Sequence, residues 1–384
     1  MLENPHTFLM KTGSNRRNIM KFRKIAALLV SAALALSFTA CSQKGSGSDD
    51  EYVLKIGEVQ GALCHAPLQV AMEKGYFDEE GIKWERVDFG GSDIQAALGS
   101  GMIDCGFGLV GKFIQPIENG LNMVITSGMH TGCTKILVRA DSGIESIADL
   151  KGKTIGVSSL ASSEAITAKR ALNAAGVDIS ADSGEVSFAV YSTTDQPVAL
   201  INGAVDAIST PDPVATNAEN EYGLKVLLDT ASTEPYASEY CCVSFVSSEL
   251  AEKHPDIAAA FTRAVLKGSA FVAANPEEAA KIQIEGEYVS GDASANAEIL
   301  KSYKYIPSVQ GGYDALVNVV NDLHDIGILK PETDVDALVG RSFKFFEGVP
   351  DSYNAEGESF TEEEVHAATA KANNAEYRMN DCCG

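Results

Sequence analysis

Cysteines and histidines recur at a few points of this 384-residue chain, and both residue types can bind metals or take part in nucleophilic chemistry. The stretch MHTGCTK, residues 129–135, holds His130 and Cys133 three positions apart, and Cys64 lies directly before His65 in QGALCH. A pair at this spacing could be two metal ligands, a nucleophile with its base, or ordinary lining of a fold. The choice depends on the elements that position these residues.

The first 40 residues have the layout of a secretory signal. The basic stretch KFRK (21–24) precedes an almost wholly apolar run, which ends in the small residues of SFTAC and is too short to span a membrane. We expect residues 1–40 to be a signal peptide, with Met20 as an alternative start, and Cys41 to become the lipidated N-terminus of a lipoprotein. Residues 41–51 then form a flexible tether, and the protein is extracytoplasmic and anchored to the cell membrane.

Charge and cysteine content narrow the possible partners. The formal net charge is −23, and removal of residues 1–40 takes away six basic residues and one acidic residue, which leaves −28. Nucleic acid is excluded as a partner, because phosphate binding needs a basic surface. Seven cysteines follow Cys41, so at least one of them has no intramolecular disulfide partner.

From Tyr52 the sequence alternates short β-branched runs with helical stretches, which predicts βαβ units and a mostly parallel sheet. The first unit is expected to have strands at 52–59, 82–89 and 103–108, with helices at 66–81 and 91–102. The alternation restarts near residue 142, with helices at 162–177 and 194–205 and strands at 185–192 and 206–213. A strand and a long helix follow from Cys241, and residues 346–384 read as an acidic C-terminal tail.

Five sequence blocks carry a resemblance to a known family: APLQVAMEKGYFDEEGIKWERVDFGGSDIQAALGSGMIDCGFG, DSGIESIADLKGKTIGV, VALINGAVDAISTPDP, FVSSELAEKHPDIAAAFTRAV and LVNVVNDLHDIGILKPETDVDALV. Together they resemble the extracytoplasmic solute-binding proteins of ABC importers for nitrate, sulfonates, taurine and thiamine-precursor pyrimidines. The resemblance implies a type II periplasmic-binding-protein-like α/β fold, with two lobes joined by a two-strand hinge. It places lobe one at 52–139 plus 241–345, lobe two at 140–240, and the crossings near 138–141 and 239–243.

The resemblance also implies a function. The protein would capture a small molecule (a sulfonate, nitrate, taurine or a pyrimidine) between closing lobes and deliver it to the transmembrane subunits of an ABC permease. It would be a monomer, have no cofactor and not be an enzyme. Pyrimidine-forming relatives carry a cysteine run near the position of YCCVSF, of which only Cys241 and Cys242 remain here.

Ligands of open α/β sheets bind at the carboxyl ends of the strands, and this rule selects the candidate ligand contacts. They are Cys64, His65, Cys105, Phe107, Gly108, His130, Cys133, Ser158, Ser159, Ser162, Ser163, Asp212 and Cys241. The serines precede a helix whose first amides could hold an anion or could simply be capped by serine. Phe107 is a candidate for stacking on a flat ligand, and Asp212 either pairs with a cationic ligand group or serves a turn.

Three interpretations of the cysteine group stay open. A disulfide could join Cys64 with Cys105, or Cys133 with Cys241. A metal could take its ligands from Cys64, His65, Cys105, His130, Cys133 and Cys241, although their spacing forms no known zinc signature. A cysteine nucleophile could use His130 as its base. The corresponding alternative functions are a scavenger of metals or metal complexes and a pyrimidine-synthase-like or Cys/His enzyme.

Overall fold

The computed structural model describes residues 52–89, 94–180, 182–361 and 363–364. The expected signal peptide, Cys41, the tether and the Cys382–Cys383 pair lie outside these residues. The described chain contains two separate five-stranded sheets, each with its own helices, and a two-stranded ribbon near residue 355.

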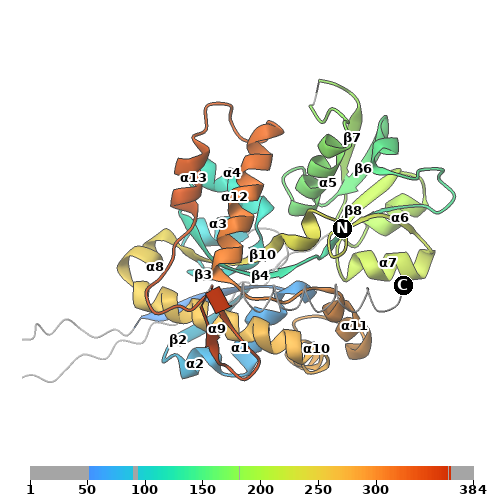
Figure 1. Cartoon of the computed structure of the whole chain (residues 1–384). Coiled ribbons are helices and arrows are strands. Elements are labelled where there is room, and N and C mark those ends of the chain that lie inside the picture. Colours follow the sequence, from blue (N-terminus) through green and yellow to red (C-terminus); the bar gives the residue numbers. More distant parts are fainter. Residues whose placement is uncertain (1–51, 90–93, 181, 362, 365–384) are drawn as a thin grey trace, which may run out of the picture. The chain divides into compact units, whose positions relative to one another are not determined.

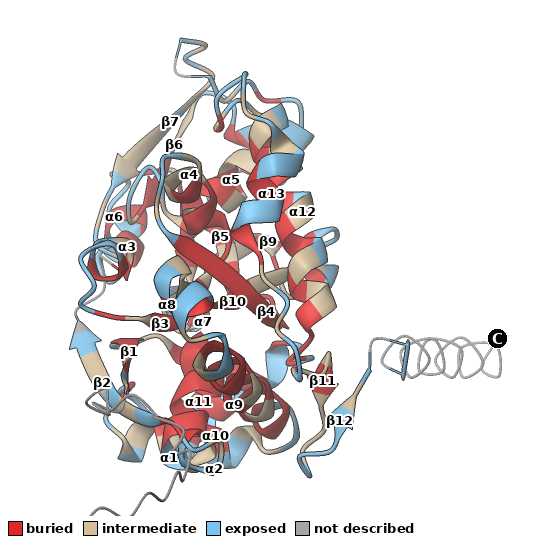
Figure 2. Cartoon of the chain, turned by 90° about the vertical axis from the view of Figure 1, so that its left-hand side faces the viewer, coloured by how far each residue is buried: buried red, intermediate tan, exposed pale blue. Residues whose placement is uncertain are grey.

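The first sheet is built from the beginning of the described chain and from a strand that returns much later. Its strands, in spatial order, are β2 (Lys83–Phe89), β1 (Val53–Val59), β3 (Cys105–Leu109), β10 (Tyr240–Ser247) and β4 (Met123–Thr131). Strand β4 is buried along its whole length, as Figure 2 shows, because α12 and α9 pack on it as well as β10. Its nine residues therefore form a core strand, and the candidate His130 lies near its carboxyl end.

Helices cover the first sheet on both faces. They are α1 (Ala66–Glu73), α2 (Tyr76–Glu79), α3 (Ile94–Gly99), α4 (Gly111–Glu118), α8 (Ser248–Lys253), α9 (Pro255–Ala274), α10 (Pro276–Glu285), α11 (Ala293–Ser302), α12 (Val309–Asp325) and α13 (Val335–Ser342), with the 3₁₀ turn η1 (Leu63–His65) before α1. Helix α9 starts at a proline, which suits the first helical position, and Pro276 follows its end. Among the described helices, α9 alone is long and apolar enough to span a membrane, but most of it is buried against α1.

The second sheet is formed by one continuous segment. Its strands, in spatial order, are β7 (Val186–Val190), β6 (Lys153–Val157), β8 (Ala207–Pro211), β5 (Thr134–Val138) and β9 (Lys225–Asp229). Its helices are α5 (Ser163–Ala174), α6 (Gln196–Ile201), α7 (Val214–Tyr222) and the 3₁₀ turns η2 (Ile147–Leu150) and η3 (Tyr236–Ser238). In Figure 1 this segment runs from teal to yellow-green, around α5, α6 and α7.

Both sheets are mixed, where the sequence had predicted mostly parallel ones. In each sheet two neighbouring strand pairs are parallel, as βαβ units require, and two are antiparallel. The antiparallel pairs involve β10 and β5, the first strand formed after each passage between the sheets.

The chain passes to the second sheet at Gly132–Cys133 and returns with Tyr240. The first passage comes before β5, and β5 pairs with β8 and β9 of the second sheet. The expected boundary at 139/140 would instead assign β5 to the first lobe. We call residues 52–132 and 240–361 the first half and residues 133–239 the second half.

Part of the expected tail is packed on the first half. Asp351 accepts hydrogen bonds from the hydroxyl of Ser308 (3.0 Å) and from the amide of Gln310 (2.7 Å), so it caps the start of α12. Ser352 is buried, and the strands β11 (Ser352–Tyr353) and β12 (Ser359–Phe360) form the small ribbon. Residues 346–361 therefore belong to the folded body.

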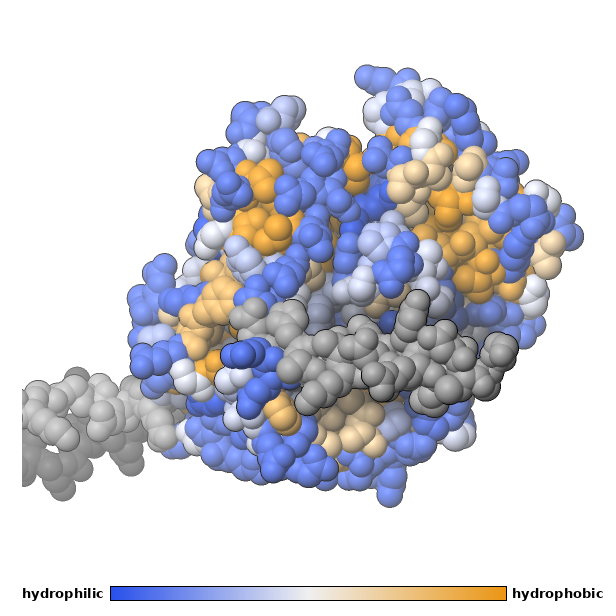
Figure 3. All heavy atoms as spheres, in the orientation of Figure 1, coloured by the Kyte–Doolittle hydropathy of each residue, from blue (hydrophilic) through white to orange (hydrophobic). Residues whose placement is uncertain are grey.

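The surface agrees with the acidic composition. Many atoms in Figure 3 are hydrophilic, and apolar patches lie over both the first and the second half. In the second half, Val190 on β7 and Val198 on α6 are more than half exposed, at 58% and 51%. Single exposed apolar side chains of this kind are ordinary on a folded protein.

Candidate ligand-binding site

A small cavity of about 40 Å³ lies where the two halves meet. Its lining comes from β3 and α4 on one side, from α5 on the other, and from the return crossing: Leu109, Val110, Gly111, Thr134, Ser163, Ile166, Thr167, Arg170, Thr230, Tyr236, Glu239, Tyr240, Cys241 and Val319. The volume is enough for a few water molecules. An organic ligand therefore needs the halves to separate before it can enter.

Directly behind the cavity, four cysteines converge. The sulfur atoms of Cys133, Cys241 and Cys242 lie within 4.8 Å of one another, and that of Cys64 lies within 4.8 Å of Cys242 and of a ring nitrogen of His130. The Cys133–Cys241 contact measures 3.3 Å, and all four thiols are free. Burial alone would raise the pKa of Cys241, but hydrogen bonds from Cys133 and Cys242 lower it to about 6.

His130 lies on β4 between the thiols and a group of aromatic rings. Its imidazole stacks on Tyr303 at 5.2 Å and lies 4.9 Å from Tyr305, with Phe107 at 6.2 Å on another side. Its Nδ1 lies 3.2 Å from the carbonyl oxygen of Thr131, which can only accept, so Nδ1 carries the proton. Nε2 is then a hydrogen-bond acceptor, and this fully buried atom has no partner among the described residues.

Two tyrosine hydroxyls share this unsatisfied state. Tyr303 and Tyr305 follow α11, and their hydroxyl oxygens are buried with no hydrogen-bond partner in the described part of the chain. Burial raises the pKa of both phenols, and the next cause is the charge of Asp212 for Tyr303 and the Cys64 thiol for Tyr305. Buried polar groups are normally hydrogen-bonded, so the unpaired imidazole nitrogen and the two unpaired hydroxyls of its neighbouring rings indicate a place where a ligand supplies the missing partners.

His65 belongs to a polar network beneath these rings. Its Nδ1 lies 3.7 Å from the carboxylate of Glu58, which also accepts a hydrogen bond from Gln69 at 2.6 Å. Gln69 accepts in turn from Gln283 on α10. The His65 ring packs edge-on against Phe107, with ring centroids 5.1 Å apart, and so helps to hold Phe107 in position.

An ion network closes one side of the cavity and joins the two halves. Arg170 on α5 bonds to Glu239 before the return crossing (2.9 Å) and to Asp322 on α12 (2.5 Å). Burial would lower the pKa of Arg170, but the two carboxylates raise it. The guanidinium is therefore already neutralised by protein groups and is not available to bind an anion.

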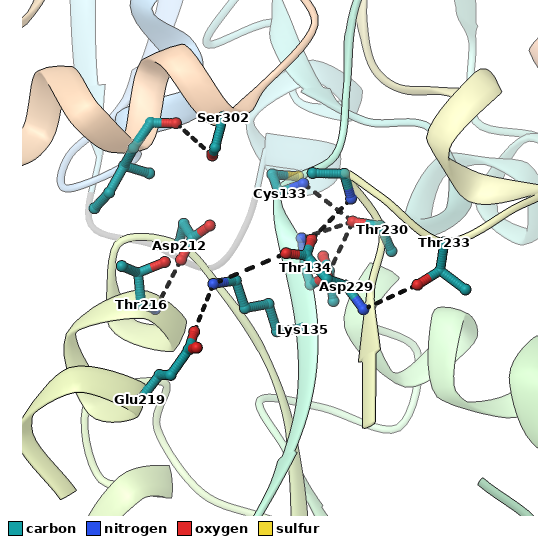
Figure 4. A network of polar contacts seen from close by, with 12 residues as sticks. Cys133, Thr134, Lys135, Asp212, Thr216, Glu219, Asp229, Thr230, Thr233 and Ser302 are labelled. Carbon is teal, nitrogen blue, oxygen red and sulfur yellow. Dashed lines mark hydrogen bonds and ion pairs between the residues drawn. The ribbon is translucent and has the colours of Figure 1, made fainter. Parts of the chain in front are cut away.

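Figure 4 shows a second network at the first crossing. Lys135 on β5 bonds to Glu219 at 2.7 Å and lies 3.9 Å from Asp229, while Thr230 accepts from the amides of Cys133 and Thr134. Asp212 accepts from the amide of Thr216 at 2.9 Å, so it caps the start of α7. Its carboxyl is 5% exposed, and burial raises its pKa.

The serines before and at the start of α5 form hydrogen bonds with other groups of the protein. Ser162 accepts from the amide of Ala165 and so caps the helix, and the hydroxyl of Ser158 donates to Glu164 in the first turn. Ser159 accepts from the Ser162 hydroxyl through its carbonyl, and Ser163 accepts from the amide of Lys112 across the halves while it lines the cavity. A carboxylate in the first turn already complements the helix dipole, which disfavours an anionic ligand at this helix start.

Three candidates, Cys105, Phe107 and Gly108, lie within β3, in agreement with the strand expected at 103–108. Phe107 is fully buried in β3 between the imidazoles of His65 and His130. Gly108 pairs with Val243, and an added Cβ there would come within 2.8 Å of the Phe113 ring. Cys105 points away from the thiol group, because its sulfur donates to the carbonyl of Lys55 at 3.8 Å.

The sequence reasoning missed Glu58, Tyr303, Tyr305, Arg170 and Glu239. The two tyrosines could have been found from YKY, because alternating aromatics are typical of an extended segment that presents both to one face. Lys304 between them bridges to Thr131, which brings both rings beside His130. Arg170 and Glu239 had no local signal, since their pairing depends on how the halves meet.

Comparison with known proteins agrees with this architecture. The chain is 29% identical over 283 residues, 70% of this chain and 80% of the relative, to the formylaminopyrimidine-binding protein of Halalkalibacterium halodurans. It is 28% identical over 268 residues, 66% of this chain and 76% of the relative, to a putative aliphatic sulfonates-binding protein of Bacillus subtilis.

Among solved structures, the periplasmic aliphatic sulphonate-binding protein of Escherichia coli superposes with a TM-score of 0.62 at 18% identity, over 76% of this chain and 92% of that chain. The predicted periplasmic-binding-protein-like fold with two α/β units is thereby confirmed. The NMT1/THI5-like family model matches residues 63–279, more than half of the chain. This protein belongs to the NMT1/THI5-like family.

Proposed function

We propose that this protein is the substrate-binding component of an ABC importer and that its ligand is a neutral heteroaromatic ring carrying an amino group, of the aminopyrimidine class. The family membership and the relatives named as binding proteins support the first part. The arrangement around His130 supports the second, and it agrees with the name of the formylaminopyrimidine-binding relative.

The observation that carries the ligand class is the unpartnered Nε2 of His130. In the tautomer fixed by Thr131 this atom accepts a hydrogen bond, so its partner must donate one. An exocyclic amino group donates, whereas a sulfonate or a nitrate has only acceptor oxygens. The hydroxyls of Tyr303 and Tyr305 can donate to ring nitrogens or to a formyl oxygen.

The shape and charge of the surroundings favour the same class. Phe107, His130 and Tyr303 pack on one another, with centroid spacings of 6.2 and 5.2 Å, and such an aromatic group can take up a flat ring when the halves separate. The nearby charges are largely satisfied by protein groups: Arg170 is paired twice, and Glu164 occupies the start of α5. An anion would therefore find no uncompensated charge at Arg170 or at the start of α5.

In this proposal the two halves are the two lobes, and they close on the ligand about the crossings at 132–133 and 239–240. The small cavity and the Arg170–Asp322 bond between the halves describe a closed arrangement. Closure is stabilised by whatever contacts the ligand makes only in this arrangement. Lipidation at Cys41 would hold the protein at the membrane, where it delivers the ligand to the permease.

The test is isothermal titration calorimetry of the purified chain with 4-amino-2-methylpyrimidine and a formylaminopyrimidine, and in parallel with two alkanesulfonates that have no amino group. We expect saturable binding of a pyrimidine and no heat from the sulfonates. Sulfonate binding without pyrimidine binding would contradict the ligand class. Chemical conversion of a pyrimidine in the same mixture, detected by mass spectrometry, would contradict the binding-protein assignment and favour an enzyme.

A further inference from the structure

The four cysteines behind the cavity come from separate parts of the chain. Cys64 lies in η1, Cys133 follows the first crossing, and Cys241 with Cys242 begins β10. Cys133 and Cys242 are 1% and 0% exposed, and Cys64 is 4% exposed. The fold thus gathers four thiols in the interior from segments up to about 180 positions apart in the sequence.

Neighbouring residues of a regular strand point to opposite faces, so Cys241 and Cys242 would ordinarily be separated. The register of β10 against β4 shifts on both sides of Cys242, between Tyr240 and Cys242 and again between Cys242 and Val243. Such bulges redirect side chains. Both sulfur atoms therefore reach the same group, within 4.8 Å of Cys133.

The spacing suits a tetrahedral metal ion. Four sulfurs bound to one zinc ion at 2.3 Å are about 3.8 Å apart. The Cys133–Cys241 separation is 3.3 Å, and the sulfurs of Cys133, Cys241 and Cys64 each lie within 4.8 Å of that of Cys242. Cys64 is not within 4.8 Å of both Cys133 and Cys241, so its side chain has to turn toward them to close a set of four. Thiolates are the ligands that Zn²⁺ and similar ions prefer, and a closed set of four is typical of a structural site.

Neighbouring groups can offset the negative charge of a four-thiolate site. Lys112 on α4 interacts electrostatically with Glu164, Cys242 and Cys64, and the Nδ1–H of His130 lies 3.7 Å from the sulfur of Cys241. These positive and donor groups offset the residual negative charge of four thiolates around a divalent ion. Cys241, which also lines the cavity, provides the path by which an ion enters.

We propose that Cys64, Cys133, Cys241 and Cys242 bind one resident thiolate-preferring ion of the Zn²⁺ class. The ion ties η1 of the first half to both crossings, and so fixes the pivot about which the halves move. It is separate from the transported ligand, which contacts the opposite edge of His130. The proposal does not depend on the identity of that ligand or on the transport function.

The test is anaerobic titration of the reduced, chelator-treated chain with Co²⁺, followed by displacement with Zn²⁺. We expect one Co²⁺ per chain, with the intense sulfur-to-cobalt absorption of a tetrathiolate site, and stoichiometric displacement by Zn²⁺. All variants are made in a Cys382→Ser/Cys383→Ser background, so that the C-terminal thiols do not contribute.

In that background, Cys133→Ser and Cys242→Ser should each weaken Co²⁺ binding by more than about 100-fold, which exceeds the effect of losing an outer hydrogen-bond partner. The control Cys105→Ser removes an equally buried thiol from the same half, outside the group, and should bind as tightly as the parent. A measurement without variants is the alkylation rate of Cys241, which Zn²⁺ should suppress at least tenfold.

Weak Co²⁺ absorption in the parent, or equal loss in Cys105→Ser and Cys133→Ser, would overturn the proposal. So would a Cys133–Cys241 disulfide in freshly purified protein that persists when zinc is supplied during expression. Pyrimidine binding is measured on the same samples. A chain that binds no metal can still bind the pyrimidine, and the reverse also holds, so failure of the metal site can be told from failure of the proposed function.

Discussion

At the scale of single residues, the site is defined by polar atoms that have no hydrogen-bond partner among the residues that the structure describes. The Nε2 atom of His130 and the hydroxyls of Tyr303 and Tyr305 are buried beside thiols and rings. An unsatisfied buried polar group costs about 1–3 kcal/mol. Such a cost in the unliganded protein becomes binding energy when a ligand supplies the missing partners.

The change Tyr303→Phe tests this balance. It removes only the hydroxyl, so ligand affinity should fall about five- to tenfold, the value of one hydrogen bond. The unliganded protein should be as stable as the parent or more stable, because an unpaired polar atom is gone. Calorimetric titration and urea unfolding measure the two quantities.

Tyr313→Phe is the matched control, because that ring packs on Phe343 and Phe345, away from His130. It should leave ligand affinity unchanged. If Tyr303→Phe lowers stability and leaves affinity intact, the hydroxyl has a structural partner and our assignment fails.

The same residues show what the sequence could and could not predict. The rule that ligands lie at strand ends selected Cys64, His130, Cys133 and Cys241, and the structure brings these four together. It could not give their depth, because a buried strand such as β4 and a loop have similar small residues in SGMHTG. It could not give Tyr303 either, since the contact with His130 depends on a loop packing across β4.

At the scale of elements, a buried ion group fastens α2 to α9 in the first half. Glu80, at the end of α2, accepts from Arg263 at 2.7 Å and from Lys267 at 2.9 Å, and its side chain is 11% exposed. Burial alone would raise the pKa of Glu80, but the two cations lower it below its ordinary value. A carboxyl with a lowered pKa stabilises the fold above its unfolded pKa, and this contribution is lost as the pH falls through the folded pKa.

The change Glu80→Gln should therefore cost about 1.5–3 kcal/mol of unfolding free energy at pH 7, the range for hydrogen bonds to charged groups. The difference from the parent should shrink below pH ~4.3, the ordinary pKa of Glu, and vanish once Glu80 is protonated in both states. Urea midpoints across this pH range measure the effect.

Glu278→Gln removes a carboxylate that is 53% exposed and pairs with Lys74, and it should change stability by less than about 0.5 kcal/mol at any pH. A difference for Glu80→Gln that grows toward acid pH would show that the sign of the shift is wrong.

At the first crossing, position 132 requires a glycine. Gly132 has φ +74°, and an added Cβ would lie 2.6 Å from the Cβ of Ala231. Gly143 has nearly the same φ, +71°, with nothing within 4 Å of the added atom. The two positions therefore share the left-handed backbone and differ only in the space for a side chain.

Gly143→Ala should cost roughly 1–2 kcal/mol, the price of the left-handed backbone. Gly132→Ala should cost about 1–3 kcal/mol more, because the chain must move away from Ala231. Thermal unfolding of both variants measures the difference. Equal losses would show that the crossing has room to adjust.

At the scale of the whole molecule, Arg170 and Asp322 join the two halves directly, and Glu239 beside the return crossing completes the group. Asp322 is 45% exposed, so salt will weaken its contribution. The family fold was predictable at this scale because five sequence blocks recur in order. The pairing across the halves was not, since it depends on their final approach.

Asp322→Asn should shift the unliganded chain toward an open arrangement. We expect a larger radius of gyration in small-angle X-ray scattering without ligand, and roughly tenfold weaker ligand binding, because part of the binding energy must then drive closure. Asp325→Asn, one turn further along and 80% exposed, is the control and should behave like the parent. Identical scattering for Asp322→Asn and the parent would show that the Arg170–Asp322 ion pair does not stabilise the closed arrangement.

The second half enters and leaves the first at adjacent points: Cys133 begins it, and Cys241, just beyond its end, has its sulfur 3.3 Å away. A segment with neighbouring ends can be removed and its gap closed by a short linker, and it can be rejoined elsewhere without stretching the chain. The second half is therefore an insertion within the first. We expect each half to fold when it is expressed separately.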